Sequence, residues 1–333
     1  MKIGFFELEK WEKEILEKSF PKEQLLLSHK KFTAVEAKKN PDLEVLYVFI
    51  YSKVDEKLLA QLPKLKLIAT RSTGFDHIAL AACKKRNIIL CNVPTYGENT
   101  VAEHTFALIL ALSRKIIECH ERTQKGSFDL TGLRGFDLRG KTLGVIGSGN
   151  IGRHVIRMAQ GFEMNLLVYD AFPNPQTAKE MGFSYVSLDQ LLKNSYIITL
   201  HIPYNEKTHH LIDAKAFAKM KKGVYLINTS RGGIVDTDAL VKALKSKKLA
   251  GAGLDVLEEE CEILEERELV HKDFPQQCNL KTLVEDHILM TMPNVIVTPH
   301  NAFNTNEALM RILQTTIDSI NGFKSGKLVN NVK

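Results

Sequence analysis

The glycines of the segment Gly147-Ser-Gly-Asn-Ile-Gly152 have the spacing that a phosphate-binding turn requires. An apolar run, 141–146, precedes this segment and an amphipathic stretch follows it, so we predict a strand, a tight turn and a helix. In such a unit the first glycine permits the turn, the second lets the backbone approach a pyrophosphate, and the third lets the helix pack on the strand. The N–H groups at the start of the helix then bind the phosphates. The segment therefore predicts a dinucleotide site.

Asp170 directly follows the next predicted strand, 165–169. A carboxylate at this place accepts hydrogen bonds from the ribose hydroxyls of the adenosine and repels a 2′-phosphate. We therefore predict NAD(H) rather than NADP(H) as the cofactor. The alternative is a glycine turn in an ordinary βαβ unit, with Asp170 capping a loop.

Three further predicted strands of the second half of the chain are each followed by side chains that can do acid, base or anion chemistry. These side chains are Arg231, then Asp255 with Glu260, then His300. A guanidinium binds a planar carboxylate in bidentate geometry and polarises an adjacent carbonyl. An imidazole beside a carboxylate is held in one orientation with its protonated form stabilised, and it can donate a proton to a developing alkoxide. Together with a hydride from the dinucleotide, this set supplies what the reduction of a 2-oxo acid requires.

Short apolar runs alternate with helix-like segments in two successive series. In the first series the predicted strands are 2–6, 45–50, 65–70 and 88–92, with a helix near 9–20. In the second series they are 141–146, 165–169, 195–202, 223–228, 250–255 and 294–298. A long helix at 101–112 lies between the series, and a helical tail at 307–323 follows them. Such alternation predicts parallel sheets with helices on both faces.

The dinucleotide unit begins in mid-chain and the helical tail follows its last strand, which predicts a discontinuous first domain. We expect a substrate domain formed by 1–100 and 300–333, and an NAD-binding domain formed by 101–299. Residues 113–140 carry charge and glycine, so we expect a surface excursion there. Residues 261–291 resemble an insertion before the last strand.

The composition is that of a soluble globular protein. The chain has 333 residues, of which 44% are apolar and 25% charged, and its length suggests two domains. The formal charge of +6 comes from scattered lysines interleaved with acids, which predicts a solvated surface rather than a nucleic-acid site. No apolar stretch is long enough to cross a membrane and the start lacks a signal peptide, so we expect a cytoplasmic protein. The five cysteines form no CxxC pair, so we expect reduced thiols and no metal site.

Motifs along nearly the whole chain point to one family. They are Thr70-Arg-Ser-Thr-Gly-Phe-Asp-His77, Asn92-Val-Pro-Thr-Tyr96, Val101-Ala-Glu-His104, Leu143-Gly-Val-Ile-Gly-Ser-Gly-Asn-Ile-Gly152, Leu200-His-Ile-Pro203, Ile227-Asn-Thr-Ser-Arg-Gly-Gly233, Gly253-Leu-Asp-Val-Leu-Glu-Glu-Glu260 and Met292-Pro-Asn-Val-Ile-Val-Thr-Pro-His-Asn-Ala-Phe303. Together they resemble the D-2-hydroxyacid dehydrogenase family, nearest its D-lactate dehydrogenase members. The resemblance implies an α/β fold of two doubly wound parallel-sheet domains, a Rossmann NAD-binding domain and a flavodoxin-like substrate domain.

The resemblance also implies roles for single residues. The family's catalytic residues fall on Arg231, Glu260 and His300. Its cofactor contacts fall on Gly147, Gly149, Asn150, Ile151, Gly152, Asp170, Ile202, Pro203, Thr208, Asn228, Thr229, Ser230 and Asp255. Its substrate contacts fall on Thr73, Gly74, Tyr96 and Arg231. Phe49, Tyr51 and Phe303 are candidates for the substrate pocket or for the apolar core.

The identity of the catalytic glutamate is open from the residues alone, because Glu258, Glu259 and Glu260 are consecutive. The family's register implies Glu260. His104 on the long helix is expected to stabilise the junction between the domains, and His209 and His210 are expected to be exposed loop residues.

The predicted activity is NAD-dependent reduction of pyruvate to D-lactate, with the D stereochemistry implied by the resemblance. Alternative substrates are glyoxylate, hydroxypyruvate and 2-oxoisocaproate. Formate oxidation is disfavoured because hydride removal from formate needs no proton donor, whereas an imidazole with a carboxylate is an acid–base device. A different class, an NAD-gated binding protein of the corepressor type, shares the fold. We expect a homodimer whose contact involves 113–140.

Overall fold

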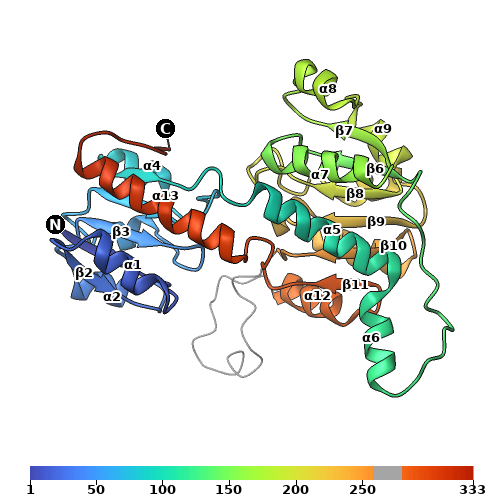
Figure 1. Ribbon diagram of the computed structural model, residues 1–333, viewed down its shortest axis with the longest axis horizontal. Helices are drawn as coiled ribbons and strands as arrows, with labels where there is room; N and C mark the ends of the chain where they lie inside the picture. The colour runs from blue at the N-terminus through green and yellow to red at the C-terminus, as the bar shows by residue number, and fades with distance from the viewer. Residues whose placement is uncertain (259–279, 333) are drawn as a thin grey trace. The chain divides into compact units, whose positions relative to one another are not determined.

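The computed structural model describes residues 1–258 and 280–332, and it divides into two compact units (Figure 1). Unit 1 consists of Met1–Tyr96 and Thr305–Lys333, and unit 2 consists of Gly97–Asn304. The first unit is thus made of two separate stretches of chain. Its boundaries fall after Tyr96 and before Thr305, a few residues from the expected positions at 100 and 300.

Unit 1 contains a parallel sheet of five strands in the order β2-β1-β3-β4-β5, which is the flavodoxin-like order. The strands are β1 (Lys2–Phe5), β2 (Gln24–Leu27), β3 (Val45–Val48), β4 (Leu67–Thr70) and β5 (Ile89–Cys91). Four of them lie within the predicted strands, whereas β2 was not predicted. It is a four-residue edge strand with no buried residue, and its apolar run is only the three leucines 25–27.

Helices cover both faces of this first sheet. They are α1 (Glu12–Ser19), α2 (Ala34–Lys39), α3 (Glu56–Leu59), α4 (Leu80–Lys85) and α13 (Asn306–Lys324). One apolar core contains residues of α2, α3 and α4, and the other contains Leu16 of α1 with Leu313 and Ile317 of α13. The C-terminal helix therefore completes a sheet whose strands all come from the start of the chain.

Unit 2 contains a parallel sheet of six strands in the order β11-β10-β9-β8-β6-β7. The strands are β6 (Thr142–Ile146), β7 (Asn165–Tyr169), β8 (Ile197–Leu200), β9 (Val224–Asn228), β10 (Leu249–Leu254) and β11 (Val295–Val297). A single parallel bridge joins Val168 of β7 to Tyr185 and acts as a very short further strand at this edge. With that bridge included, the order around β6 is that of a doubly wound dinucleotide-binding sheet. The fold class predicted from the sequence is confirmed.

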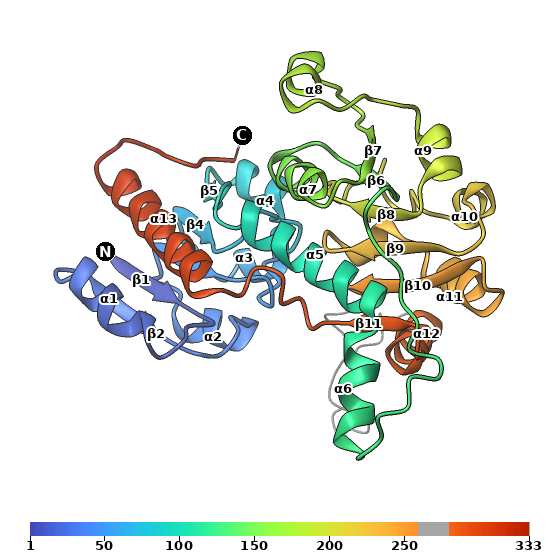
Figure 2. The same ribbon diagram turned by 45° about the vertical axis from the view of Figure 1, so that its right-hand side comes forward.

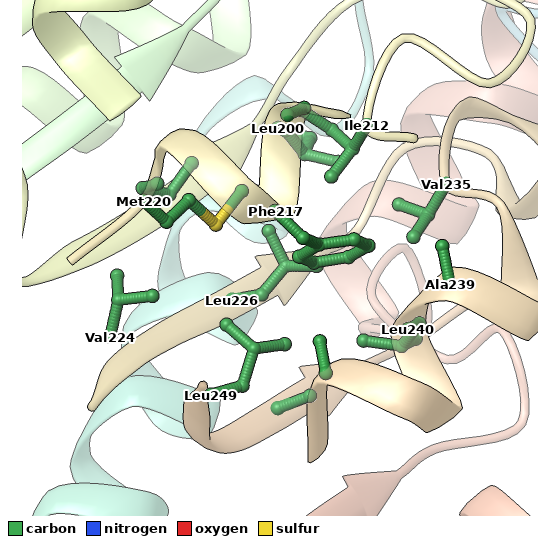
Figure 3. Close-up of a cluster of buried hydrophobic side chains, with 14 of the residues drawn as sticks. Leu200, Ile212, Phe217, Met220, Val224, Leu226, Val235, Ala239, Leu240 and Leu249 are labelled. Atoms are coloured by element: carbon green, nitrogen blue, oxygen red, sulfur yellow. The ribbon is translucent and has the colours of Figure 1, made fainter. Parts of the chain in front are cut away.

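The helices of unit 2 form two layers, apart from α6, which projects away from the sheet in both views of Figures 1 and 2. They are α5 (Glu98–Arg114), α6 (Ile116–Gln124), α7 (Asn150–Gly161), α8 (Pro175–Met181), α9 (Leu188–Asn194), α10 (Ala214–Lys219), α11 (Thr237–Lys245) and α12 (Leu280–Thr291). One core packs α5 and α7 on the sheet. The opposite core packs α9, α10, α11 and α12 on the other face, with Phe217 between Leu226 and Leu240 (Figure 3).

Two segments depart from expectation. The excursion 113–140 begins with the nine-residue helix α6, which has no buried residue. The segment 261–291 ends in α12, and its earlier residues lie outside the described chain. None of the described helices is long and apolar enough to span a bilayer.

Candidate active site

The glycine loop after β6 has the geometry that a bound pyrophosphate requires. Gly147 has a φ of 100°, and a Cβ there would lie 2.3 Å from the carbonyl oxygen of His201. A Cβ on Gly152 would lie 2.0 Å from the carbonyl oxygen of Gly147, so only glycine lets α7 approach β6. A Cβ on Gly149 would meet no atom within 4 Å. The first and third glycines thus serve the turn and the packing, while the second leaves the backbone open to a ligand.

The carboxylate of Asp170 is held over this loop. One oxygen accepts hydrogen bonds from the backbone N–H and the hydroxyl of Ser148, both at 2.7 Å, and the other accepts from the N–H of Phe172 at 2.9 Å. The hydroxyl of Tyr185 lies 2.8 Å from that of Ser148. Partial burial opposes ionisation of Asp170, but the hydrogen bonds from Phe172 and Ser148 and the charge of Arg153 outweigh it and keep the pKa of Asp170 below its usual value.

Apart from Asp255, the other predicted cofactor residues lie on two loops of the same sheet edge. The hydroxyl of Thr208 donates to the carbonyl of Pro203 at 2.7 Å, which closes the loop that follows Ile202. In the loop after β9, the amide of Asn228 donates to the carbonyl of Arg231 at 2.9 Å, and its oxygen accepts from the N–H of Ser230 at 3.0 Å. Both loops are therefore held by their own side chains.

Backbone hydrogen bonds join the ends of β9, β10 and β11, where the predicted catalytic residues stand. The N–H of Asp255 donates to the carbonyl of Asn228, and the N–H of His300 donates to the carbonyl of Asp255, both at 2.9 Å. Arg231 is half-buried and donates to the carbonyl of Ser230 at 2.8 Å. The structure thus brings the segments that carry Arg231 and His300 to the same edge of one sheet, on either side of the end of β10.

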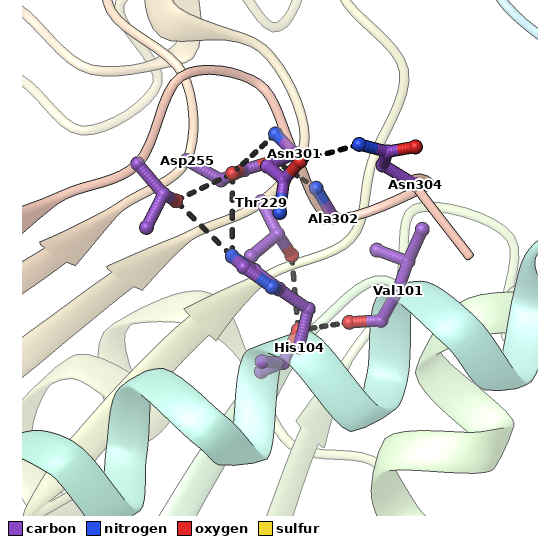
Figure 4. A network of polar contacts seen from close by, with 9 residues as sticks. Val101, His104, Thr229, Asp255, Asn301, Ala302 and Asn304 are labelled. Carbon is purple, nitrogen blue, oxygen red and sulfur yellow. Dashed lines mark hydrogen bonds and ion pairs between the residues drawn. The ribbon is translucent and has the colours of Figure 1, made fainter.

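The carboxylate of Asp255 organises the turn that carries His300 (Figure 4). Asp255 is 1% exposed and accepts hydrogen bonds from the N–H groups of Asn301 and Ala302 and from the hydroxyl of Thr298. His300 itself has a φ of 50°, in the left-handed region that residues other than glycine rarely adopt. Such strain persists only where the surroundings impose it, and it is typical of functional sites.

His104 reaches the same carboxylate from α5. Its Nε2 lies 3.3 Å from Oδ1 of Asp255 and 3.1 Å from the hydroxyl of Thr298. Burial opposes ionisation of Asp255, but the hydrogen bonds from His104, Thr298, Ala302 and Asn301 outweigh it, so the pKa of Asp255 lies below its usual value. Within unit 2 the partners of His104 are therefore the aspartate and the threonine beside His300. The expected cofactor contact of Asp255 stays a prediction.

Glu258, one of the three candidate glutamates, is engaged elsewhere. Its carboxylate lies 2.6 Å from Nε2 of His210 through one oxygen and accepts from the hydroxyl of Thr237 at 2.7 Å through the other. This argues against Glu258 as the partner of His300, and it corrects the expectation that His210 is simply exposed. Glu259 and Glu260 lie outside the described residues.

The predicted substrate residues of unit 1 follow β4 and β5. The hydroxyl of Thr73 donates to the carbonyl of Val93 at 2.8 Å, and the amide of Asn92 donates to the carbonyl of Thr73 at 2.8 Å. In the described part of the chain, the backbone N–H groups of Thr73 and Gly74 donate to no other residue. The carbonyl of Tyr96 accepts from Arg311. Two N–H donors are thus presented by a loop that is held in place on both sides.

The aromatic candidates have different surroundings. Phe303 of unit 2 is half-buried, with its ring centroid 6.4 Å from that of His300. In unit 1, Phe49 is 8% exposed and Tyr51 is 53% exposed. Phe49 thus serves the apolar core, whereas Tyr51 has most of its surface open.

Comparison with known proteins gives a consistent result. Residues 106–302 match the family described as D-isomer specific 2-hydroxyacid dehydrogenase, NAD binding domain. A 2-hydroxyacid dehydrogenase homolog of Haemophilus influenzae is 41% identical over 294 residues, which cover 87% of this chain and 85% of that protein. The chain belongs to the D-isomer specific 2-hydroxyacid dehydrogenase family. The resemblance seen in the sequence motifs is confirmed.

Two further members of the D-2-hydroxyacid dehydrogenase family are named for different substrates. The glyoxylate reductase of Thermococcus litoralis is 35% identical over 298 residues, which cover 87% of this chain and 83% of that protein. The crystal structure of D-lactate dehydrogenase from Aquifex aeolicus, complexed with NAD and lactic acid, has a TM-score of 0.86 and 38% identity, and covers 98% of this chain and 96% of that chain. This D-2-hydroxyacid dehydrogenase is therefore an NAD-dependent oxidoreductase that acts on a CH–OH group. Its relatives are named for different substrates, so similarity alone does not select the substrate.

Sequence reasoning did not assign several polar residues to this site. Ser148 holds Asp170 and is itself bonded to Tyr185, while His104 and Thr298 hold Asp255. The motif 101–104 contained the signal for His104, because a histidine on an otherwise apolar helix needs a polar partner. The partners themselves come from distant parts of the chain, so spacing could not identify them.

Proposed function

We propose that this D-2-hydroxyacid dehydrogenase reduces a small 2-oxo acid, pyruvate before others, to the D-2-hydroxy acid with NADH. The observation that carries the proposal is the hydrogen-bonded junction of three strand ends that presents Arg231 and His300 at one sheet edge. An arginine and a histidine placed in this way suit a substrate that has a carboxylate next to a carbonyl. The similarity to a D-lactate dehydrogenase across nearly the full chain supports pyruvate.

In unit 2, different residues bind the substrate carboxylate and donate the proton. When bound, NADH supplies the hydride that adds to C2 of the substrate. The guanidinium of Arg231 binds the substrate carboxylate and polarises the C2 carbonyl. The imidazolium of His300 transfers its proton to the C2 oxygen as that oxygen becomes an alkoxide. Glu260, the glutamate that the family register implies, would stabilise the imidazolium, and Asp255 holds the turn on which His300 stands.

The cofactor fits the described residues of the glycine loop. Gly149 leaves the backbone open where a pyrophosphate would approach, and the N–H groups of Asn150 and Ile151 begin α7 behind it. Asp170 would accept from the ribose hydroxyls. Ile202, Pro203 and Thr208 would line the nicotinamide side, with Asn228, Thr229 and Ser230 in the next loop.

The substrate contacts proposed for unit 1 are the N–H groups of Thr73 and Gly74, which would donate to the substrate carboxylate. Tyr96 follows the neighbouring strand β5 and would lie beside them. Phe303, near the ring of His300, would contact the substrate side chain.

Steady-state kinetics with a panel of 2-oxo acids test the proposal. Pyruvate, glyoxylate, hydroxypyruvate, phenylpyruvate and 2-oxoisocaproate would each be offered with NADH, and kcat/KM compared. We expect the highest value for pyruvate. A higher value for glyoxylate, as the name of the Thermococcus litoralis relative suggests, would replace pyruvate but keep the reaction class. Tight NADH binding without turnover of any of these acids would favour the binding-protein alternative.

We also propose that the protein is a homodimer whose contact involves residues 113–140, a segment that we call the arm. Ile116 is 56% exposed, Phe128 is 84% exposed and Leu130 is 79% exposed. Large apolar side chains gathered on one projecting segment are typical of a protein–protein contact.

A further inference from the structure

The carboxylate of Glu7 is bound to the segment that follows β3. One oxygen accepts from the N–H of Phe49 at 2.8 Å and from the hydroxyl of Ser52 at 2.6 Å. The other oxygen accepts from the N–H of Tyr51 at 3.0 Å. A single side chain thus satisfies two backbone donors and one hydroxyl within residues 49–52, which fixes the course of that loop.

Arg71 links the backbone of Glu7 to the end of the neighbouring strand β4. Arg71 follows β4 directly and is 4% exposed. Its Nη1 donates to the carbonyl of Glu7 at 2.7 Å, and its Nη2 lies 2.7 Å from a carboxylate oxygen of Glu12. The guanidinium carbon lies 5.4 Å from the ring centroid of Phe49. The chain ends of β1, β3 and β4 are therefore tied together by Glu7 and Arg71.

This arrangement is costly for the residues that make it. Glu7 has a φ of 58°, in the left-handed region. Burial raises its pKa, and the hydrogen bonds from Ser52, Phe49 and Tyr51 and the charge of Arg71 only partly oppose that rise. A strained backbone together with a partly buried, fully hydrogen-bonded acid is more typical of a functional position than of simple packing.

The loop that Glu7 organises lies at the edge where substrates bind in such sheets. In unit 1, the register pairs Phe5 with Tyr47 and Val48 with Thr70, so Glu7, residues 49–52 and the loop 72–74 leave the sheet at the same carboxyl edge. The loop 72–74 carries the N–H donors that we assign to the substrate carboxylate. Tyr51, held by Glu7 at its N–H, is an exposed aromatic residue that follows β3, the strand paired with β4.

We propose that Glu7 is a positioning residue that determines substrate selectivity, by setting the conformation of residues 49–52 against the side chain of the 2-oxo acid. This inference rests on the proposed function. The hydrogen-bond partners that the structure gives the Glu7 carboxylate and carbonyl all belong to unit 1. Loss of the carboxylate should therefore change the ranking of 2-oxo acids and leave NADH affinity unchanged.

The test is kcat/KM for pyruvate and for 2-oxoisocaproate in the wild-type enzyme and in Glu7→Gln. The amide oxygen of glutamine can replace only one of the two carboxylate oxygens, so its NH₂ group would face the N–H of either Phe49 or Tyr51 and that hydrogen bond would be lost. We expect the ratio of the two kcat/KM values to change by about tenfold, the effect typical of losing hydrogen bonds to a charged group. We expect the change mainly in KM, with the dissociation constant for NADH within about twofold of the wild-type value.

Glu44→Gln is the matched control. Glu44 precedes β3 and accepts from Lys2 and Lys66 at the amino edge of the same sheet. It should leave the selectivity ratio unchanged. An equal change in Glu44→Gln, or an unchanged ratio in Glu7→Gln, overturns the inference. If Glu7→Gln does not fold, Ser52→Ala decides the question, because it removes one of the loop's bonds to Glu7 and should shift the ratio in the same direction. Failure of the wild-type enzyme to reduce any 2-oxo acid would instead overturn the proposed function.

Discussion

Arg231 is the residue whose proposed role separates anchoring from catalysis most clearly. An arginine that only anchored the carboxylate would contribute equally to ground state and transition state, so its loss would raise KM and leave kcat unchanged. Arg231→Lys keeps the charge but loses the planar fork. We predict at least a tenfold loss in kcat/KM, about 1.4 kcal/mol, with kcat reduced as well. Saturation kinetics with pyruvate and NADH would measure both, and a normal kcat with a raised KM would make Arg231 a simple anchor.

Asp170 is predicted to set the choice between NADH and NADPH. Its carboxylate is ionised and held in place by Ser148 and Phe172, so it would attract ribose hydroxyls and repel a phosphate. We expect Asp170→Ala to lower the ratio of kcat/KM for NADH to kcat/KM for NADPH by about tenfold or more. This is the effect typical of losing hydrogen bonds to a charged group. The measurement is kcat/KM for each cofactor at saturating pyruvate. A wild-type enzyme that used NADPH as well as NADH would contradict the assignment.

At the residue scale, the predictable positions were those with a rigid backbone requirement or a place at a strand end. Gly147 and Gly152 could be assigned from spacing, because a Cβ at either position would strike backbone atoms. The pairing of Glu258 with His210 could not be predicted from spacing. The two residues are far apart in sequence, and His210 adopts a left-handed φ of 48°. Three consecutive glutamates offered no local signal by which to separate them.

At the element scale, strands buried on both sides were the easiest to find. Residues Ile197–Leu200 of β8 are all buried, which gives the continuous apolar run that parallel strands show. The edge strand β2 has an apolar run of only three residues, none of them buried, and the bridge at Tyr185 is a single residue pair. The helix α6 was missed for a related reason, because a helix without a buried face lacks a strong apolar stripe.

The segment that follows β8 makes stability depend on pH. Burial lowers the pKa of His201 from 6.5 to about 3. The unfolded chain therefore takes up a proton on His201 as the pH falls below about 6.5, whereas the folded chain does not until the pH nears 3. As the pH falls from about 6.5 towards 3, the free energy of unfolding should therefore decrease by up to about 1.4 kcal/mol per pH unit.

His201→Asn should remove this dependence. Urea unfolding of the two proteins at pH 7 and pH 5 would give the free energies of unfolding. We expect the wild-type protein to lose more stability than the variant between these pH values, whatever the stability of the variant at pH 7. Equal losses would mean that His201 is neutral in the unfolded chain as well or protonated in both states.

At the scale of the whole molecule, the return of the chain to its first unit was predictable because the dinucleotide motif begins in mid-chain. The exact boundaries at Tyr96 and Thr305 were harder to predict. The helices α5 and α13 begin directly after them, without a glycine- or proline-rich linker to mark the change of unit.

The proposed dimer can be tested through the exposed arm. Phe128→Ser together with Leu130→Ser should weaken self-association, because both side chains are largely exposed in the single chain and would be buried in a contact. Sedimentation equilibrium of the wild-type and variant proteins measures this, and we expect a dimer for the former and a lower apparent mass for the latter. A wild-type monomer would contradict the proposal.

The central claim is that His300 donates the proton in an NADH-dependent reduction of a 2-oxo acid, and kcat of His300→Ala with pyruvate tests it most directly. Removing such a group typically lowers the rate by ~10²–10⁴-fold. We predict a loss of this size, with NADH binding measured by fluorescence unchanged and with an exposed-histidine control, His29→Ala, fully active. A kcat near the wild-type value in His300→Ala would contradict the account.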